Sequence, residues 1–367
     1  MVRYKTIKSI AKSILYKKCP LYVQVQVTPL CNHNCSFCGI IHSFKDTKLL
    51  SIDDMKIISK NLSDLEVGVV VLTGGEPMTR KDIFDVVKFY SDENIDIRVQ
   101  TNGSMLTKEA VLKFNDANLS GITISLDSLY EDKMNNIIRA KNFKKIIQGI
   151  VNVKKYGKFE AVCLNTVVNK QNIAEIPDII KFASELNIFV SLIPLHIGNN
   201  GLFSKETSKD DNNSIKSEED LKIFNDTMNS LIKMKKQGYL ILNPLDHLKG
   251  IYNFMTTGIH SWKCDSPYLY FSVAPDGTFC PCLEYKTDYK VNSSDFAQTY
   301  KSSKFNKSVR EIVNSCEGCY YLCWLEVSSF IKNPLRLMKR ALELYKVKKG
   351  DKIDYDKVIK KYIKFNS

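Results

Sequence analysis

The chain of 367 residues lacks any run of about 18 apolar residues, so no transmembrane helix is expected. Its start alternates lysine with apolar residues and lacks the apolar segment and small-residue cleavage site of a signal peptide. Histidine is scarce, and its five residues show no pairing pattern that favours catalysis. With 44% hydrophobic and 25% charged residues, the composition excludes wholesale disorder and collagen. We therefore predict a cytoplasmic globular protein.

Acidic residues are too few to balance the basic ones. The chain has 53 Lys+Arg and 40 Asp+Glu, which gives a net charge of +13. Residues 1–18 carry +6 and residues 331–367 carry +8, so residues 19–330 sum to −1. The excess charge is thus confined to the two ends. Because no RNA-recognition motif accompanies it, nucleic-acid binding is not favoured.

Cysteine, in contrast, is plentiful, and its distribution indicates metal sites. A cytoplasmic chain does not keep structural disulfides, because its surroundings are reducing. Nine of the eleven cysteines fall within residues 31–38 and 264–323, and such clusters favour metal ligation. We interpret the other two, Cys19 and Cys163, as small buried apolar residues.

The first cluster is Cys31, Cys35 and Cys38, on the loop after a strand-like run at residues 22–27. Three thiolates are one ligand short of tetrahedral zinc or a fully ligated iron–sulfur cluster. A [4Fe–4S] cluster held by three cysteines leaves one iron open for a substrate or cofactor. The alternative is zinc with His33 as the fourth ligand, although ligands so close in sequence strain a tetrahedron.

This cysteine spacing resembles that of the radical S-adenosylmethionine (SAM) superfamily. Three further motifs follow in the order that the family shows, each at the end of a strand-like run: Gly74–Pro77 (Gly-Gly-Glu-Pro), Thr101–Gly103 and Ser125–Asp127. Any one of them alone would be an ordinary strand–helix loop. All four in order favour the resemblance.

Strand-like and helix-like segments alternate from residue 21 to about 197, which predicts a parallel sheet. The resemblance implies a partial (β/α)6 barrel, whose sites form at the carboxyl ends of the strands. The expected strands are 22–27, 67–73, 96–101, 121–126, 160–168 and 188–194. The expected helices are 52–63, 81–91, 107–117, 141–156 and 173–185.

The resemblance implies that residues at the strand ends bind SAM. They are Phe37, Gly74, Gly75, Glu76, Thr101, Asn102, Ser125 and Arg139. The glycines and Glu76 would hold the methionine amino group, and Arg139 would pair with the carboxylate. Thr101, Asn102 and Ser125 would line the ribose or carboxylate side, and Phe37 would stack by the adenine. A solvated helix-end cation is the alternative for Arg139, and a core contact is the alternative for Phe37.

The second cluster begins with a β-hairpin that turns at Asp276–Gly277, so Cys264 and Cys282 lie near each other. Its first half is similar to the auxiliary-cluster domains called SPASM and twitch. We expect one auxiliary [4Fe–4S] cluster, bound by Cys264, Cys282, Cys316 and Cys319. Cys280 and Cys323 are alternates or ligands of a second cluster. A zinc ribbon is the competing hypothesis, because the Cys-x2-Cys spacing also suits zinc.

The resemblance implies an enzyme that reductively cleaves SAM to a 5′-deoxyadenosyl radical and abstracts hydrogen from a substrate, with electrons from a donor such as flavodoxin or ferredoxin. The protein orients and shields these cofactors. The substrate is a peptide or protein side chain, or a small molecule or lipid. The auxiliary cluster is expected to transfer electrons. The alternative from a different class is a non-catalytic zinc module that recognises nucleic acid through its basic ends.

The predicted layout has five parts. They are a basic helix at 1–20, the barrel at 21–200, a linker and helix at 201–262, the auxiliary domain at 263–330 and a basic helical tail at 331–367. The first and last parts are predicted amphipathic helices. Either each packs its apolar stripe on the barrel, or the two dock on an anionic membrane or an acidic partner.

Overall fold

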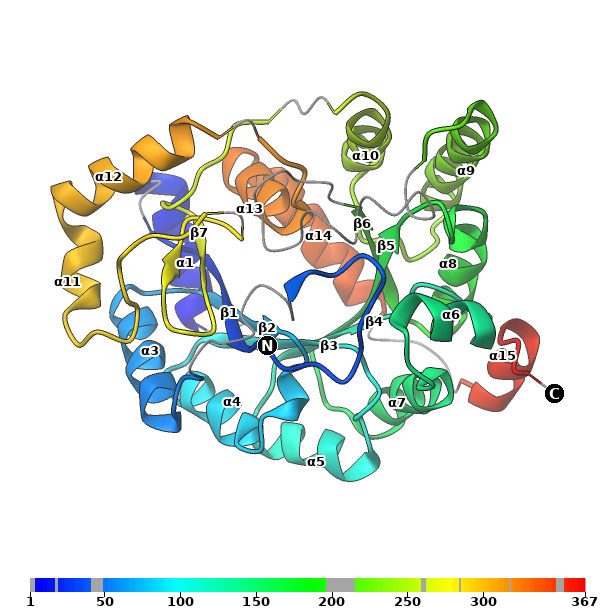
Figure 1. Cartoon of the computed structure of the whole chain (residues 1–367), viewed down its shortest axis with the longest axis horizontal. Coiled ribbons are helices and arrows are strands. Elements are labelled where there is room, and N and C mark those ends of the chain that lie inside the picture. The colour runs from blue at the N-terminus through cyan, green and yellow to red at the C-terminus, as the bar shows by residue number, and fades with distance from the viewer. Residues whose placement is uncertain are drawn as a thin grey trace.

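The computed structural model describes residues 4–16, 19–40, 49–195, 215–258, 262–283, 285–316, 318–347 and 353–366. Eight strands form one curved sheet with helices around its outside (Figure 1). Its order is β6-β5-β4-β3-β2-β1-β7-β8, and among these described strands all neighbours pair in parallel except β7 and β8. The strands are β1 (Tyr22–Thr28), β2 (Val69–Gly74), β3 (Asp96–Thr101), β4 (Gly121–Ser125), β5 (Ala161–Val168), β6 (Phe189–Pro194), β7 (Tyr270–Val273) and β8 (Phe279–Cys280).

The first six strands and their helices confirm the predicted partial barrel, and each predicted strand lies within two residues of an observed one. The helices are α3 (Ile52–Asp64), α4 (Ile83–Asp92), α5 (Lys108–Asp116), α6 (Glu131–Ile138), α7 (Phe143–Tyr156) and α8 (Ile176–Glu185). Helix α6 is not among the predicted helices. Its signal was present, because Met134, Ile137 and Ile138 recur at helical spacing and are buried.

Side chains alternate between the two faces of each strand. On β1, Val23, Val25 and Val27 are fully buried in the main hydrophobic core that the helices share. The opposite face of the same strand therefore directs Gln24 and Gln26 into the interior of the barrel. This alternation gives the barrel an apolar outer layer and a polar inner lining at β1.

The carboxy-terminal part continues the sheet. Its helices are α9 (Glu218–Lys236), α10 (Leu245–Thr257), α11 (Phe296–Lys301), α12 (Ser303–Asn314), α13 (Leu322–Lys332), α14 (Pro334–Val347) and α15 (Tyr355–Tyr362). The predicted hairpin is present: β7 and β8 pair around a turn in which Gly277 adopts a φ of 81°. In addition, β7 pairs in parallel with β1, so the predicted auxiliary region is joined to the barrel through backbone hydrogen bonds.

The amino-terminal helix α1 (Tyr4–Tyr16) lies against the amino-terminal ends of the strands. Thr6 Oγ1 donates to the Gly68 carbonyl, directly before β2, and Ser13 Oγ donates to the Cys19 carbonyl. No described helix is both long and apolar enough to cross a membrane. The predicted linker falls partly on residues 196–214, which lie outside the described residues. The cytoplasmic location stays a prediction.

The outer edge of β6 is covered by one side chain and a short backbone bridge. Asn243 is fully buried; its Nδ2 donates to the Leu192 carbonyl at 2.9 Å and its Oδ1 accepts from the Leu192 amide at 2.8 Å. Nearby, Ile241 forms an isolated bridge to Val190. Together they satisfy backbone groups that an open edge leaves exposed.

We predict that Asn243→Ala lowers the free energy of unfolding by about 2–4 kcal/mol, because it leaves two buried backbone groups unpaired. Asn229→Ala, on the exposed face of α9, is the matched control and should stay within about 0.5 kcal/mol. Chemical denaturation measures both. Equal stability of the two variants would show that water or another group covers the β6 edge.

Candidate functional site

The three cysteines of the first cluster lie together on the loop after β1. The charges of Cys31 and Cys38 both act on the thiol of Cys35, and Cys31 also acts on Cys38. Burial raises the pKa of the Cys38 thiol to about 11 and also raises the pKa of Cys35. Buried thiolates so close together need a cation to compensate their charge. The donor set therefore suits a thiolate-bound metal centre.

The carboxyl end of α6 holds this cysteine loop. The amides of Asn34 and Ser36 donate to the carbonyls of Ile138 (3.0 Å) and Ile137 (2.9 Å). Directly after them, Arg139 ends the helix in the left-handed region (φ 49°) with its side chain exposed. These bonds place the predicted Arg139 beside the loop.

The glycines after β2 are required by the close approach of two loops. The Gly75 amide donates to the Thr28 carbonyl and the Glu76 amide to the Leu30 carbonyl, both at 2.7 Å. A Cβ on Gly74 would lie 2.3 Å from the Thr28 oxygen, and one on Gly75 would lie 2.2 Å from the Leu30 oxygen. The glycines thus seat the Gly-Gly-Glu-Pro loop against the start of the cysteine loop.

Glu76 is fully buried and joins the ends of β2 and β3. Its Oε1 accepts from Thr101 Oγ1 at 2.7 Å and from the Met78 amide at 3.1 Å, while its Oε2 accepts from the Asn102 amide at 2.7 Å. Burial raises the pKa of Glu76, although these hydrogen bonds favour the ionised form. Thr101 is buried and donates its hydroxyl hydrogen to Glu76, so its side chain orients this carboxylate.

A second network ties β3 to the cysteine loop. Asn102 Nδ2 donates to Asn32 Oδ1 at 2.8 Å, and Asn32 Nδ2 donates to Ser104 Oγ at 2.9 Å. Burial raises the pKa of the Cys31 thiol, and a hydrogen bond from the Asn102 side chain lowers it. Asn102 therefore contacts the first cysteine. The sequence analysis missed Asn32 and Ser104, because isolated Asn and Ser residues in a loop carry no motif.

The remaining predicted residues lie around the same end of the barrel. Ser125 ends β4 half-buried, with Asn165 of β5 as its register partner. Two residues later, burial raises the pKa of Asp127 to about 7, and its Oδ1 accepts from the Val167 amide at 2.7 Å. Phe37 is half-buried and packs on the main hydrophobic core. The structure thus gathers all eight predicted SAM-site residues around the carboxyl ends of β1 to β4.

His33 would be the fourth ligand of the alternative zinc site. Its Nε2 lies 3.0 Å from Asn142 Nδ2, its Nδ1 is buried without a hydrogen-bond partner, and burial lowers the pKa of the ring to about 4. In the described part of the chain, no three His, Cys, Asp or Glu side chains converge as ligands of a single ion. A cubane cluster sets a different requirement, because each of its cysteines binds a different iron.

In the second cluster, four thiols interact with one another. Cys316 acts on the ionisation of Cys264, and Cys264, Cys316 and Cys323 all act on Cys319. Burial is the main cause of the raised pKa of Cys264 and Cys319. Polar contacts support the group: Tyr270 Oη donates to Cys264 Sγ at 3.4 Å.

The two other cysteines of this region lie on the β8 side of the hairpin. Cys280 is buried at the end of β8 with its Sγ 3.7 Å from the Thr278 carbonyl oxygen, and burial raises its pKa to about 12. Cys282 is half-buried in an isolated bridge with Tyr285. Ser266 Oγ donates to the Pro281 carbonyl at 2.5 Å, which keeps the segments of Cys264 and Cys282 adjacent.

One hydrophobic cluster borders both cysteine groups. Its buried residues include Ile40, Tyr270, Tyr321 and Trp324, from the cysteine loop, β7 and the segment around α13. Packed against it are thiols of both groups: Cys38, Cys264, Cys319 and Cys323. The two cysteine groups are therefore bordered by the same hydrophobic side chains.

Residues 25–183 match the family model of the radical SAM superfamily, and they hold the cysteine loop, the Gly-Gly-Glu-Pro loop and the ends of β3 and β4. The chain carries a radical SAM domain. Domains of this superfamily use a [4Fe–4S] cluster and SAM. The three-cysteine loop fits such a cluster.

Two curated relatives are named GTP 3′,8-cyclases. A GTP 3′,8-cyclase of Marinobacter nauticus is 34% identical over 176 residues, which are 47% of this chain and 53% of that protein. Another from Listeria welshimeri is 33% identical over 193 residues, which are 50% of this chain and 57% of that protein. The chain thus spans about half the length of the curated relatives it matches.

Solved structures resemble the fold over a larger share of the chain. SuiB of Streptococcus suis, bound to its precursor peptide SuiA, has a TM-score of 0.62 at 18% identity and covers 83% of this chain and 70% of that one. The enzyme anSMEcpe with bound AdoMet has a TM-score of 0.59 at 16% identity, covering 88% and 99%. At these identities the likeness concerns the fold, which extends beyond the radical SAM domain.

We predict that Gly75→Ala removes the first cluster. The new Cβ forces the β2 loop away from Leu30, and the cysteine loop then loses the backbone contacts that position it. Iron analysis after anaerobic reconstitution should then show about four fewer irons per chain than the wild type. Gly238→Ala is the control for backbone strain away from the site, because Gly238 has a φ of 95° but its Cβ would meet no atom within 4 Å. Full iron content in Gly75→Ala would mean that the cysteine loop folds independently of the β2 loop.

Proposed function

We propose that this protein is a radical SAM enzyme that abstracts hydrogen from a polar substrate held inside the barrel. The observation that carries the proposal is the hydrogen-bonded joining of the three-cysteine loop, the Gly-Gly-Glu-Pro loop and the end of β3. When bound, the reduced cluster supplies the electron that breaks the C5′–S bond of SAM, which yields methionine and a 5′-deoxyadenosyl radical that takes a hydrogen atom from the substrate. Every other task belongs to the residues of the chain.

Glu76 and Arg139 would orient SAM through its charged groups. Glu76 accepts hydrogen bonds from three neutral donors, and a carboxylate has about four acceptor sites, so one remains for the methionine ammonium. The positive charge of the ammonium would offset the cost of burying the ionised Glu76 carboxylate and so lower its pKa. Arg139, exposed beside the cysteine loop, would pair with the carboxylate of SAM.

The polar lining of the barrel supports a polar substrate. Among the described residues, Gln24 Oε1, Gln26 Oε1 and Ser272 Oγ are buried without a hydrogen-bond partner. Gln24 and Ser272 are register partners on β1 and β7. Buried polar atoms are costly unless a partner satisfies them, and an apolar lipid tail supplies none. A peptide or a polar small molecule fits this lining better than a lipid.

GTP is the first substrate to test, because the curated relatives named above are GTP 3′,8-cyclases at 33–34% identity. A peptide is the second candidate, since the fold likeness includes SuiB bound to a precursor peptide. Both are polar, as the lining requires.

The auxiliary site would hold one [4Fe–4S] cluster that exchanges electrons with the substrate. Cys264, Cys316 and Cys319 are common to the predicted ligand set and to the observed thiol group. Cys323 supplies the fourth thiol in the observed group, and Cys282 is the fourth ligand that the sequence predicts. The hydrophobic cluster shared with Cys38 would shield the path between the two centres. An external donor such as flavodoxin or ferredoxin would reduce the first cluster.

We predict about eight irons per reconstituted chain, four at each site. Cys316→Ala should remove about four of them and leave SAM cleavage at the first cluster detectable. Cys280→Ala is the matched control and should keep all of them, because its thiol faces the Thr278 carbonyl. Iron and sulfide analysis measures the content. Unchanged iron in Cys316→Ala would exclude it as a ligand.

The direct test of the activity is anaerobic incubation of the reconstituted protein with SAM and dithionite. We expect 5′-deoxyadenosine and methionine in equal amounts, detected by liquid chromatography and mass spectrometry. Cys35→Ala should reduce their formation by at least about a thousandfold, since the cluster that delivers the electron is lost. Binding of two zinc ions with no SAM cleavage by the wild type would overturn the proposal.

A further inference from the structure

Two helices at one end of the molecule expose apolar side chains. On α14, Leu335, Met338 and Leu342 are 72%, 64% and 63% exposed, and their spacing of three and four residues puts them on one helix face. On α1, Ile7 and Leu15 are 55% and 72% exposed and lie about 80° apart around the helix. We call these five residues the apolar face. The sequence left open whether such stripes pack on the barrel, and in α14 this one does not.

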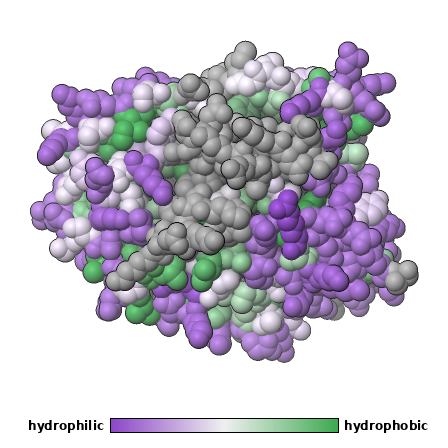
Figure 2. Space-filling model, viewed as in Figure 1, coloured by the Kyte–Doolittle hydropathy of each residue, from purple (hydrophilic) through white to green (hydrophobic). Residues whose placement is uncertain are grey.

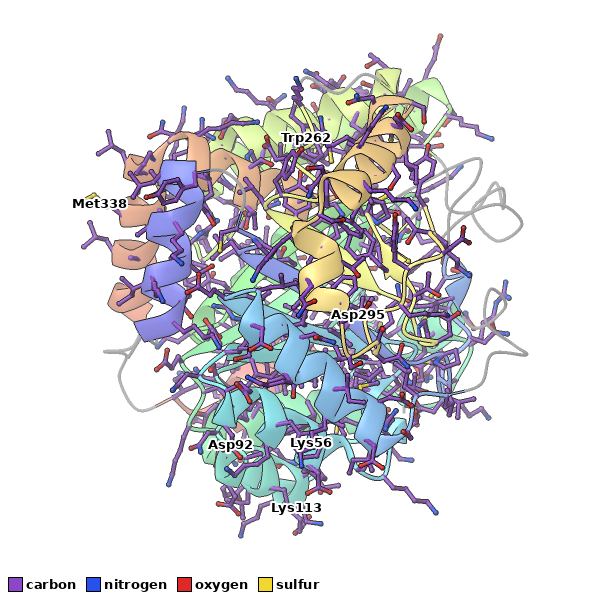
Figure 3. The ribbon with its side chains drawn as sticks, turned by 90° about the vertical axis from the view of Figure 1, so that its left-hand side faces the viewer. Lys56, Asp92, Lys113, Trp262, Asp295 and Met338 are labelled. Atoms are coloured by element: carbon purple, nitrogen blue, oxygen red, sulfur yellow. The ribbon has the colours of Figure 1, made fainter. Side chains whose placement is uncertain are left out.

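Both helices lie at the same edge of the molecule. Helix α13 contacts both α1 and α14, and in Figure 3 the two helices occupy one edge, with Met338 projecting outward. Thr6 of α1 bonds the carbonyl before β2, so this edge is the amino-terminal end of the strands. The cysteine loop and the Gly-Gly-Glu-Pro loop lie at the opposite, carboxyl end.

Basic residues outnumber acidic ones on these two helices. Helix α1 contains three lysines and no acidic residue, and α14 contains Arg336, Lys339, Arg340 and Lys346 against Glu343. Part of this charge is paired with the rest of the protein, because Lys8 and Lys12 bind Glu66, Arg336 binds Asp246, and the buried Arg340 binds Glu326. With these three carboxylates counted, the two helices together retain a charge of +3. The neighbouring segment to residue 352 adds Lys348, Lys349 and Lys352 against Asp351 in sequence. A second copy of the chain would bring these like charges together, whereas an anionic surface complements them.

We propose that the apolar face docks the protein on an anionic lipid bilayer. The exposed apolar side chains would enter the headgroup region while the basic side chains around them contact acidic lipids, as in interfacial amphipathic helices. The cysteine loop lies at the carboxyl end of the barrel, opposite the apolar face. In the bound enzyme this end of the barrel, which we call its mouth, would face the water. The docked orientation therefore suits a water-borne substrate, in agreement with the polar lining. In the view of Figure 2, hydrophilic residues cover much of the described rim of the mouth face.

The test is flotation of the full reconstituted chain with vesicles of phosphatidylcholine, with or without phosphatidylglycerol. We expect binding that requires phosphatidylglycerol and weakens as salt is raised. The triple variant Leu335→Gln/Met338→Gln/Leu342→Gln should lower the partition coefficient by about tenfold or more, since three side chains no longer enter the interface. The double variant Ile57→Gln/Leu112→Gln removes comparably exposed apolar residues (38% and 41%) from α3 and α5 and should bind like the wild type.

Three results would overturn the proposal: no binding of the wild type to anionic vesicles, equal binding by the triple variant, or a wild-type dimer in sedimentation that the triple variant abolishes. The last result would assign the apolar face to a second copy. SAM cleavage without vesicles should be the same in the wild type and the triple variant. Its loss in both would count against the proposed function and leave the docking result independent.

Discussion

The close packing of the β2 loop on the β1 loop is the constraint on which the rest of the site depends. Two backbone hydrogen bonds of 2.7 Å join these loops, from the Gly75 amide to the Thr28 carbonyl and from the Glu76 amide to the Leu30 carbonyl. They can form only because Gly74 and Gly75 have no side chains. They set the direction of the cysteine loop from its first residue. They also turn Glu76 inward, where Thr101 and Asn102 fix its carboxylate. Loss of this contact would separate the cluster ligands from the SAM-binding residues.

Sequence reasoning predicted the elements of the barrel well, because buried parallel strands and amphipathic helices have distinct periods. It predicted the site residues through short motifs, and the structure adds what those motifs hide. Glu76 is buried by its own loop, Thr101 supports Glu76, and α6 holds the cysteine loop through the Ile137 and Ile138 carbonyls. Backbone contacts between residues about a hundred positions apart leave no local pattern. For the same reason, the parallel pairing of β7 with β1 could not be predicted.

The carboxy-terminal part has two roles in this account. Through β7 it extends the sheet, and through Ser272 it adds a polar group to the lining of the barrel. Through α13 it contributes to the hydrophobic cluster that borders both cysteine groups. The excess positive charge takes no part in this chemistry. Part of it lies on α1 and α14, at the far end of the barrel, and there it concerns where the protein binds rather than what it converts.

The central claim is that the first cluster has an open iron that binds SAM while the second cluster is closed by protein thiolates. Electron paramagnetic resonance of the dithionite-reduced protein, recorded with and without SAM, tests it most directly. The account predicts two overlapping cluster signals, of which one changes on addition of SAM, and predicts that a Cys31→Ala/Cys35→Ala/Cys38→Ala variant retains only the signal that does not change. A spectrum unaffected by SAM, or a SAM-dependent change that persists in the triple variant, would contradict it.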